Sequence, residues 1–326
     1  MSTDVYLSYD IDHKEIMYSK NLDKEIAPAS ITKLMTAILL LDNFQINEQI
    51  EISIIDDDIK GKIAHLVKGE TMTVSTLLDF LLVYSANDAA HAVALAVSAT
   101  EEDFINMMNI KAKQLGMNNT NFKNVHGLDE PGHFTTAKDL LILSLEAISY
   151  DEILVSTSKE FFSTSINNNE QIKYSSTNAL ISKNFTGLKT GWTTNAGLTF
   201  IGLYQFMNRN IITIVNQSKV DLKKYNHFSD TLLLKNSSVN NFKEINILDQ
   251  GAIIANIYSG LGTRPVKNDS SINIFGNVEN KHEFASIIVD YNLITLIYDN
   301  NVLVKVSIPQ LKKFTVFDKL FFWLFS

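Results

Sequence analysis

A serine and a lysine stand at the head of the most apolar stretch of the chain. The run Pro28-Ala29-Ser30-Ile31-Thr32-Lys33 leads directly into Leu34-Met35-Thr36-Ala37-Ile38-Leu39-Leu40-Leu41. A helix that is apolar on nearly every side has to be buried inside a domain. This segment therefore predicts the central helix around which the rest of a domain packs.

Ser30 and Lys33 are spaced so that a helix would bring the hydroxyl and the amine to the same face. In a first turn, burial and the positive end of the helix dipole both lower the pKa of a lysine. Because a neutral lysine can accept a proton, the pair is a candidate nucleophile and general base. The alternative is that Ser30 only caps the helix and that Lys33 extends to water.

The composition argues against several classes of function. The chain has 326 residues and 45% of them are hydrophobic, which is enough for two domains and excludes wholesale disorder. Its formal net charge is -8 and its arginines are Arg209 and Arg264 alone, so a nucleic-acid partner is not expected. The absence of cysteine removes disulfides, thiolate metal sites and cysteine nucleophiles.

Two further segments carry candidate chemical groups. Ser85-Ala86-Asn87 falls between apolar runs with helical spacing at 74–84 and 89–97, where Asn87 or Asp88 could equally be a helix cap. Lys189-Thr190-Gly191 lies on a predicted strand, and by itself it could be only a basic strand end beside a turn glycine. His126, in the polar loop 118–133, is more typical of a structural hydrogen-bonding residue.

The order of elements predicts an α+β fold. A hairpin at 5–18 precedes a mainly helical region, and strands prevail from residue 161 onward until a last helix at 219–234. A run rich in serine and asparagine at 236–241 indicates a domain boundary, and short strands follow as far as residue 308. We therefore expect a catalytic domain over 1–236, a small β domain over 237–310 and a separate C-terminal segment over 311–326.

The C-terminal segment 311–326 has an amphipathic pattern. A helix would set Phe314, Phe317, Phe321 and Leu324 against Lys312, Thr315 and Lys319. This pattern predicts a helix that lies in a membrane interface, and the alternative is a terminal helix docked on the protein's own core. No run is long enough to span a bilayer, and the first ten residues show no signal peptide, so the chain is either cytoplasmic or begins at a mature end.

Taken together, Ser30-x-x-Lys33, Ser85-x-Asn87 and Lys189-Thr190-Gly191 resemble the three motifs of the penicillin-recognising serine acyltransferases. Finer similarity points to the low-molecular-mass D-alanyl-D-alanine carboxypeptidases of peptidase family S11, and it is carried by segments 27–37, 85–89, 115–117, 126–128 and 187–191. The resemblance covers about residues 4–235. It implies a transpeptidase/β-lactamase-like domain, with an antiparallel sheet and helices on both faces, followed by a small all-β domain and a C-terminal amphipathic helix.

The resemblance also implies the reacting groups. Ser30 would attack the carbonyl between two D-alanines of a peptidoglycan stem peptide, with neutral Lys33 as the base. Ser85 and Lys189 would pass a proton to the departing D-alanine, while Asn87 would bind the peptide amide and hold Lys33. No metal or organic cofactor is implied.

Substrate binding is assigned in the same way. The backbone N–H groups of Ser30 and Trp192 would form an oxyanion hole. Thr190 and Thr193, with Gly191 between them, would bind the terminal carboxylate of the substrate. Lys224 stands at the position nearest to an arginine that the family uses for the same carboxylate, and lysine cannot provide a bidentate fork.

The function implied by the resemblance is removal of the terminal D-alanine from stem pentapeptides by a penicillin-binding, membrane-associated, extracytoplasmic enzyme. Its partners would be the stem peptide, β-lactam inhibitors and a membrane surface. A β-lactamase is one alternative, but no convincing Glu-x-x-x-Asn loop lies between Asn87 and Lys189. A catalytically weak penicillin-binding scaffold that contributes to cell shape is the other alternative.

Overall fold

The computed structural model describes residues 1–53, 59–166, 171–206, 209–220, 226–248, 253–259, 262–267, 272–277, 286–290, 293–298 and 301–307. Its contacts divide the chain into two units, Met1–Ser238 and Val239–Ser326, which are described separately. Lys224 and the segment 311–326 lie outside the described residues. No helix in the described part of the chain has the length and hydropathy needed to cross a membrane.

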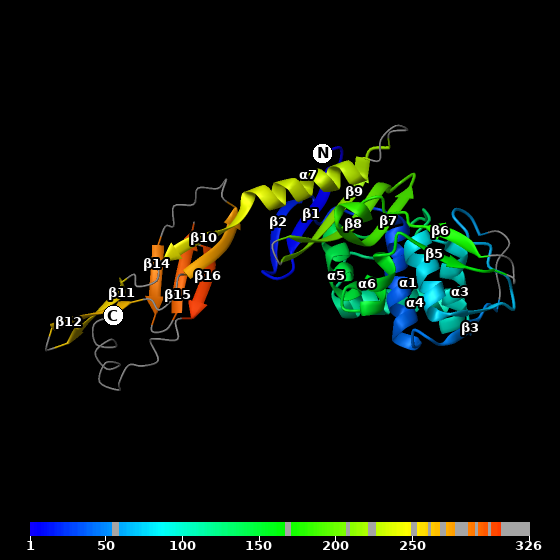
Figure 1. Cartoon of the computed structure of the whole chain (residues 1–326), viewed down its shortest axis with the longest axis horizontal. Helices are drawn as coiled ribbons and strands as arrows, with labels where there is room; N and C mark the ends of the chain where they lie inside the picture. Colours follow the sequence, from blue (N-terminus) through cyan, green and yellow to red (C-terminus); the bar gives the residue numbers. More distant parts are fainter. Residues whose placement is uncertain are drawn as a thin grey trace. The chain divides into compact units, whose positions relative to one another are not determined.

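The first unit is built on a five-stranded antiparallel sheet with the order β2-β1-β9-β8-β7 (Figure 1). The N-terminal hairpin supplies one edge and the three later strands complete the sheet. The strands are β1 (Val5–Asp10), β2 (Glu15–Lys20), β7 (Phe185–Thr193), β8 (Gly197–Phe206) and β9 (Arg209–Ser218). The register pairs β1 with β9 from Val5↔Asn216 to Asp10↔Ile211, so the two ends of the unit's chain lie side by side.

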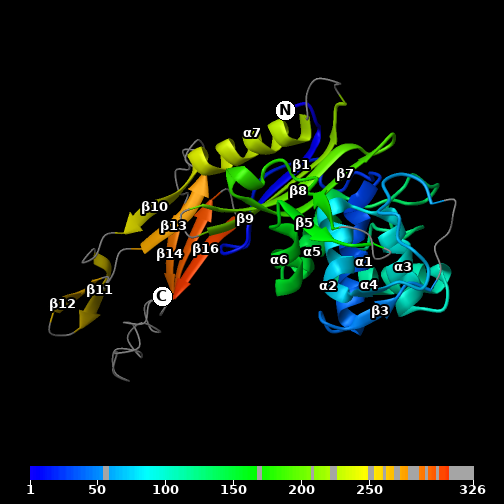
Figure 2. The ribbon, with the colours of Figure 1, turned by 45° about the vertical axis from the view of Figure 1, so that its right-hand side comes forward.

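Helix α1 (Lys33–Asn43) is buried over most of its length, as its apolar sequence predicts. It packs against α3, α4 and α5 on one side of the sheet, and α5 in turn contacts β1 and β9 (Figure 2). The helices of this layer are α2 (Val74–Asp79), α3 (Asn87–Val97), α4 (Glu101–Leu115), α5 (Ala137–Ala147) and α6 (Asp151–Thr157). Two short hairpins accompany them, β3 (Gln49–Glu51) with β4 (Thr71–Thr73) and β5 (Phe161–Thr164) with β6 (Ile172–Ser175).

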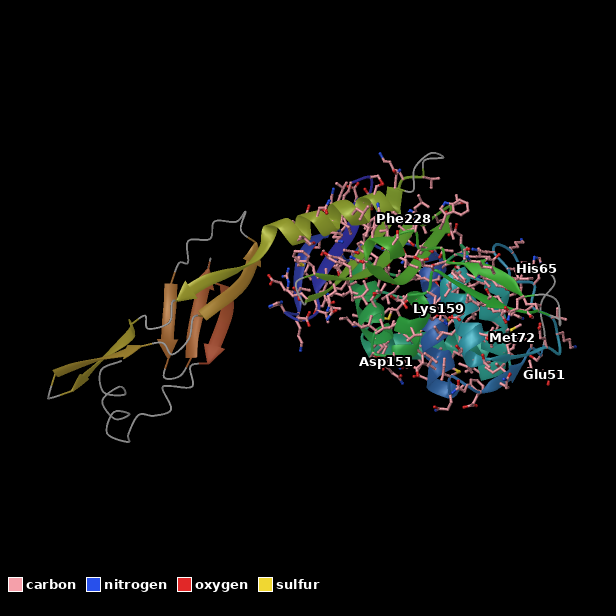
Figure 3. The ribbon with its side chains drawn as sticks, viewed as in Figure 1. Glu51, His65, Met72, Asp151, Lys159 and Phe228 are labelled. Carbon is pink, nitrogen blue, oxygen red and sulfur yellow. The ribbon has the colours of Figure 1, made fainter. Side chains whose placement is uncertain are left out.

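Helix α7 (Asn226–Asn241) covers the opposite face of the sheet (Figures 1 and 2). The Phe228 ring packs edge-on against Phe200 of β8 with ring centroids 5.2 Å apart, and Figure 3 labels Phe228 where α7 meets the sheet. Ser218 at the end of β9 donates to the carboxylate of Asp230 at 2.8 Å. The sheet therefore has helices on both faces, and α7 begins and ends about seven residues later than the predicted helix at 219–234.

Two predictions about local structure are wrong. The expected single helix at 74–84 is α2 followed by a π-helix over Phe80–Tyr84, after which Ser85 takes a left-handed conformation with φ 69°. Ser30 is not the cap of α1: it lies within a 3-10 helix, Ala29–Thr32, and makes no side-chain capping bond. In both places the backbone departs from regular α-helix where the predicted chemical groups stand.

Beyond the end of α7 at Asn241, the described residues of the second unit lie in strands. Antiparallel pairing joins β10 with β13, β11 with β12, and β14 with β15 and β16. The strands are β10 (Phe242–Leu248), β11 (Ile253–Ser259), β12 (Gly262–Lys267), β13 (Ile272–Asn277), β14 (Ser286–Asp290), β15 (Leu293–Tyr298) and β16 (Asn301–Ser307).

Candidate active site

Ser30 is held in place by glycines on two sides. Ala29, directly before it, has a positive φ of 49°, and a side chain on Gly127 would come within 1.8 Å of the Ala29 carbonyl oxygen. A side chain on Gly191 of β7 would lie 3.1 Å from the Ser30 nitrogen. Only glycine allows these two segments to approach so closely, and together they fix the backbone of the candidate nucleophile.

Lys33 is completely buried, which contradicts the alternative in which it extends to water. Its Nζ lies 3.1 Å from Ser30 Oγ and donates to Asn87 Oδ1 at 2.6 Å and to the His126 carbonyl oxygen at 2.8 Å. No carboxylate among the described residues forms an ion pair with it. Burial is the main cause that lowers the pKa of Lys33 to about 7; nearby Asp88 raises this pKa and Lys62 lowers it further.

Ser85 and Lys189 form a second hydroxyl–amine pair. Lys189, 2% exposed, donates from Nζ to Ser85 Oγ at 2.9 Å and to the Thr190 carbonyl oxygen at 2.9 Å. Burial, with Lys33 and Lys62 adding to the effect, holds the pKa of Lys189 well below its usual value. The structure thus brings together Ser30, Lys33, Ser85, Asn87 and Lys189, which are far apart in the sequence.

The β7 residues assigned to substrate binding differ in exposure. Thr190 and Thr193 are buried: Thr190 Oγ1 donates to Thr177 Oγ1 at 2.6 Å, and Thr193 Oγ1 accepts from the Ala196 N–H at 3.1 Å. Trp192, by contrast, is 59% exposed. The structure therefore places Thr190, Gly191, Trp192 and Thr193 along one strand, while Lys224 lies outside the described residues.

Asp88 and Asn87 fasten the loop 59–66 beside the site. The Asp88 carboxylate accepts the N–H groups of Ala64 and Leu66 at 2.9 and 3.1 Å. The Asn87 N–H donates to the Lys62 carbonyl oxygen at 2.7 Å, and Asn87 Nδ2 donates to that of Lys60 at 2.7 Å. Asn87 thus holds Lys33 and this loop at the same time.

Two histidines form hydrogen bonds to residues of the site. The Lys123 N–H donates to His133 Nδ1 at 3.0 Å, so Nε2 carries the proton and donates to Thr32 Oγ1 at 3.0 Å. His126 offers its carbonyl oxygen to Lys33 rather than its ring. Burial lowers the pKa of each imidazole to about 4, which keeps both rings neutral at ordinary pH. The structural role predicted for His126 agrees with this placement.

Sequence reasoning missed Lys62, Asp88 and His133 as parts of this site. Asp88 was visible only as a possible helix cap, and His133 and Lys62 lie in segments without periodicity. The described residues contain no group of three or more His, Asp or Glu side chains arranged to hold a metal ion.

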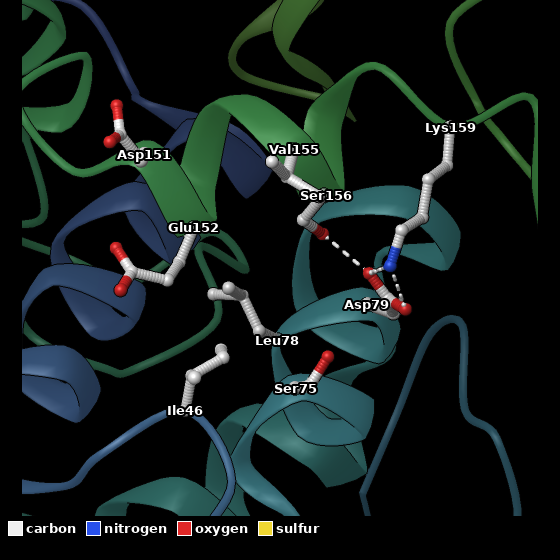
Figure 4. A pocket seen from close by; sticks show the side chains of 9 residues that line it. All are labelled: Ile46, Ser75, Leu78, Asp79, Asp151, Glu152, Val155, Ser156 and Lys159. Atoms are coloured by element: carbon white, nitrogen blue, oxygen red, sulfur yellow. Dashed lines mark hydrogen bonds and ion pairs between the residues drawn. The ribbon is translucent and has the colours of Figure 1, made fainter.

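A separate hollow of about 180 Å³ lies between α2 and α6 (Figure 4). At one end, Lys159 Nζ contacts both carboxylate oxygens of Asp79, at 2.8 and 2.6 Å, and the Ser156 hydroxyl donates to Asp79 Oδ1 at 2.8 Å. Figure 3 shows Asp151 and Lys159 well apart from His65, which stands on the loop beside the site. The Asp79–Lys159 pair joins the two helices and lies outside the candidate active site.

The first unit matches the family model described as D-alanyl-D-alanine carboxypeptidase, peptidase S11, over residues 1–219. The chain belongs to this family. A relative named D-alanyl-D-alanine carboxypeptidase DacF, from Bacillus subtilis, is 33% identical over 211 residues, which are 63% of this chain and 54% of the relative. DacC from Escherichia coli is 31% identical over 67% of this chain and 57% of the relative. The chain therefore spans little more than half the length of these two S11 relatives.

Solved structures agree with the S11 fold. Penicillin-binding protein D2 from Listeria monocytogenes, in its cefotaxime-bound form, is 33% identical with a TM-score of 0.64, over 73% of this chain and 97% of that one. Penicillin-binding protein 5 from Haemophilus influenzae, 22% identical, has a TM-score of 0.71 over 94% of this chain and 96% of that one and supports the fold alone. The prediction of an α+β, transpeptidase/β-lactamase-like fold with an antiparallel sheet is confirmed.

Proposed function

We propose that the chain is a serine-type D-Ala-D-Ala carboxypeptidase that removes the terminal D-alanine from peptidoglycan stem pentapeptides through an acyl-enzyme on Ser30. The observation that carries the proposal is the environment of Lys33, which is fully buried, has a pKa of about 7 and lies 3.1 Å from Ser30 Oγ. A lysine in that state is largely neutral just above neutral pH and can accept the serine proton. Membership of the S11 family supports the choice of substrate.

In the acylation step, Lys33 Nζ takes the proton of Ser30 Oγ while the oxygen attacks the carbonyl carbon of the penultimate D-alanine. The negative charge that develops on the carbonyl oxygen is stabilised by the backbone N–H groups of Ser30 and Trp192. As the C–N bond breaks, the Ser85 hydroxyl donates its proton to the leaving amine and is reprotonated from the lysines. D-alanine leaves and Ser30 carries the shortened peptide as an ester.

In the deacylation step, water attacks the ester carbonyl and gives a proton to Lys33, and the C–O bond breaks to restore the Ser30 hydroxyl. Thr190 and Thr193, with Lys224, bind the substrate's terminal carboxylate. Asn87 orients Lys33 and binds the peptide amide of the substrate. Every step uses groups of this chain and water, so the proposed reaction includes neither a metal nor an organic cofactor.

The test is D-alanine release from a pentapeptide that ends in D-Ala-D-Ala, together with labelling by a fluorescent penicillin. The wild-type chain should do both, and Ser30→Ala should do neither. Ser158→Ala, which removes an exposed hydroxyl at the end of α6, is the matched control and should behave as wild type. Penicillin labelling without D-alanine release would favour the cell-shape scaffold, and rapid hydrolysis of the penicillin would favour a β-lactamase.

We further propose that residues 237–310 form a small all-β domain and that residues 311–326 form an amphipathic helix that places the enzyme on an extracytoplasmic membrane surface. The proposal is supported by the strands of the second unit and by the separation of phenylalanines from lysines in the tail. Deletion of 312–326 should move the chain from anionic vesicles to the supernatant in sedimentation. A truncated chain that still sediments with vesicles would contradict the tail's role.

A further inference from the structure

We propose that Lys62 is a specificity-determining residue of this site, which binds a carboxylate carried by the acyl-donor part of the substrate. This inference rests on the proposed function and names a feature of the substrate. Four observations carry it: the anchoring of the Lys62 backbone, the position of its ammonium group, the charge around it, and the strand that lies across the site.

The backbone at Lys62 is fixed by the active site itself. Its carbonyl oxygen accepts the N–H of Asn87 at 2.7 Å, and Asn87 Oδ1 accepts from Lys33 at 2.6 Å. On either side the loop is held by Asn87 Nδ2 at Lys60 and by the Asp88 carboxylate at Ala64. Lys62 therefore has a defined position relative to Lys33, although it lies on a loop.

The side chain of Lys62 extends over the ring of Tyr84, with Nζ 3.8 Å from the ring centroid. Tyr84 directly precedes Ser85, and its ring packs edge-on against Tyr174 of β6 at 4.9 Å. A cation above an aromatic face is attracted to it while its remaining N–H donors stay available. Lys62 is an exposed residue, and Tyr84, over which its ammonium lies, directly precedes Ser85.

The charges around Lys62 favour an anion. It forms no ion pair with a carboxylate among the described residues, and the amines of Lys33 and Lys189 are buried and bonded to site groups. Asp88, an acidic group of this region, already accepts N–H groups from Ala64, Leu66 and Ala89. Among the described residues, the Lys62 ammonium is therefore a cation without a carboxylate partner beside the site, and such a charge attracts anionic groups of a substrate.

The position of β7 indicates that the carboxylate bound by Lys62 belongs to the acyl-donor part of the substrate. β7 is the last strand in the sheet order, pairs with β8 on one edge, and carries Lys189, whose Nζ reaches across to Ser85. An extended peptide can add to such an edge with alternate side chains directed away from the strand. A side chain directed toward Tyr84 would then meet the Lys62 ammonium, whereas the leaving D-alanine carries only the terminal carboxylate that Thr190 and Thr193 bind.

The experiment compares acetyl-Glu-D-Ala-D-Ala with acetyl-Gln-D-Ala-D-Ala, two donors of equal shape that differ in one charge. For the wild-type chain, kcat/KM for D-alanine release should favour the glutamate peptide about two- to fivefold at low salt, as for a solvent-exposed ion pair. Lys62→Gln should bring this ratio to about one, and Lys62→Arg should keep it. Lys68→Gln, which removes another exposed cation two residues beyond the loop, is the control and should retain the wild-type ratio.

The outcomes separate this inference from the proposed function. If the wild-type chain releases D-alanine without preference, or if Lys62→Gln keeps the preference, the role of Lys62 is wrong and the carboxypeptidase is not. If neither peptide is hydrolysed, the proposed function fails, and the same two peptides are then compared as competitors of penicillin labelling at Ser30. Equal competition by the two peptides would overturn the role of Lys62 in that case as well.

Discussion

Two lysines of the first unit, Lys33 and Lys159, are both fixed by hydrogen bonds but have opposite kinds of partners. Lys159 meets the Asp79 carboxylate at 2.6 Å and joins the segment after α6 to the end of α2. Lys33 has only neutral acceptors, the Asn87 amide, the His126 carbonyl and the Ser30 hydroxyl, and burial lowers its pKa to about 7. The comparison teaches that burial lowers the pKa of Lys33 effectively because no bonded carboxylate opposes it, which leaves the amine free to accept a proton.

The largest effect is expected for Lys33→Arg. A guanidinium stays charged at any accessible pH and cannot accept the serine proton, so kcat/KM should fall by about a thousandfold or more. Lys159→Arg is the matched change at the other lysine and should leave kcat/KM near the wild-type value. D-alanine release is measured side by side for the two folded variants. Comparable losses of kcat/KM in both would contradict the distinction between Lys33 and Lys159.

A smaller but still large effect is expected for Gly127→Ala, next to the carbonyl that accepts from Lys33. The new methyl group would meet the Ala29 carbonyl oxygen at 1.8 Å, at a φ of 93°. Overpacking and backbone strain together should lower the free energy of unfolding by about 3 kcal/mol or more. Gly116 has a similar φ of 88°, and a side chain there would meet no atom within 4 Å. Urea denaturation of Gly116→Ala should therefore show a loss of only about 1 kcal/mol in the free energy of unfolding. Equal losses in the two variants would mean that packing against Ala29 is unimportant.

Lys159→Met should destabilise the fold without changing the chemistry. It leaves Asp79, whose side chain is 8% exposed, without its cation, and the free energy of unfolding should fall by about 2 to 3 kcal/mol. Asp79→Asn should cost less, because Lys159 is 31% exposed and its ammonium can turn to water. Urea denaturation gives both values, and D-alanine release per folded molecule should stay unchanged. A reversed order of the two losses would contradict this description of the pair.

The smallest effect on kcat/KM is expected for a change of one pH unit. Only the neutral form of Lys33 accepts a proton, so kcat/KM should decline tenfold for each unit that pH falls below about 7. His126 and His133, each with a pKa of about 4, remain neutral over most of this range and should not change the slope of the pH profile of kcat/KM. A profile of kcat/KM between pH 5 and 9 tests this. If the rate continued to rise toward the usual pKa of lysine, Lys33 would not be depressed by its surroundings.

The sequence predicts those parts of the site whose residues are close along the chain or whose motifs are recognisable as a set. Ser30 and Lys33 are close because one turn of helix joins them, and this proximity follows from spacing alone. Ser85, Asn87 and Lys189 come together through packing between distant elements, so they are recognisable only as a set. The buried state of Lys33 was predicted from the apolar run that follows it, and the structure confirms that burial.

Other features depend on contacts that periodicity does not encode. The left-handed φ of Ser85 follows a π-helix, which differs from an α-helix by one residue in its hydrogen bonding. The alternative in which Ser30 only caps α1 is wrong, because the chain enters this helix through a 3-10 turn. The position of the loop 59–66 depends on backbone hydrogen bonds to Asn87 and Asp88 and on the burial of Ala64 and Leu66 in the core. The roles of Lys224 and of the segment 311–326 stay predictions.

The hydrogen bonds that hold the loop 59–66 are made to its backbone rather than to its side chains. Asn87 and Asp88 bind carbonyl and N–H groups, at Lys60, Lys62, Ala64 and Leu66, and such groups are common to every residue except proline at an N–H position. The side chains that the loop presents to solvent can consequently be exchanged while its path stays the same. In engineering terms, residues 60 and 62 form a cassette whose side chains can be varied without moving Ser30 or Lys33.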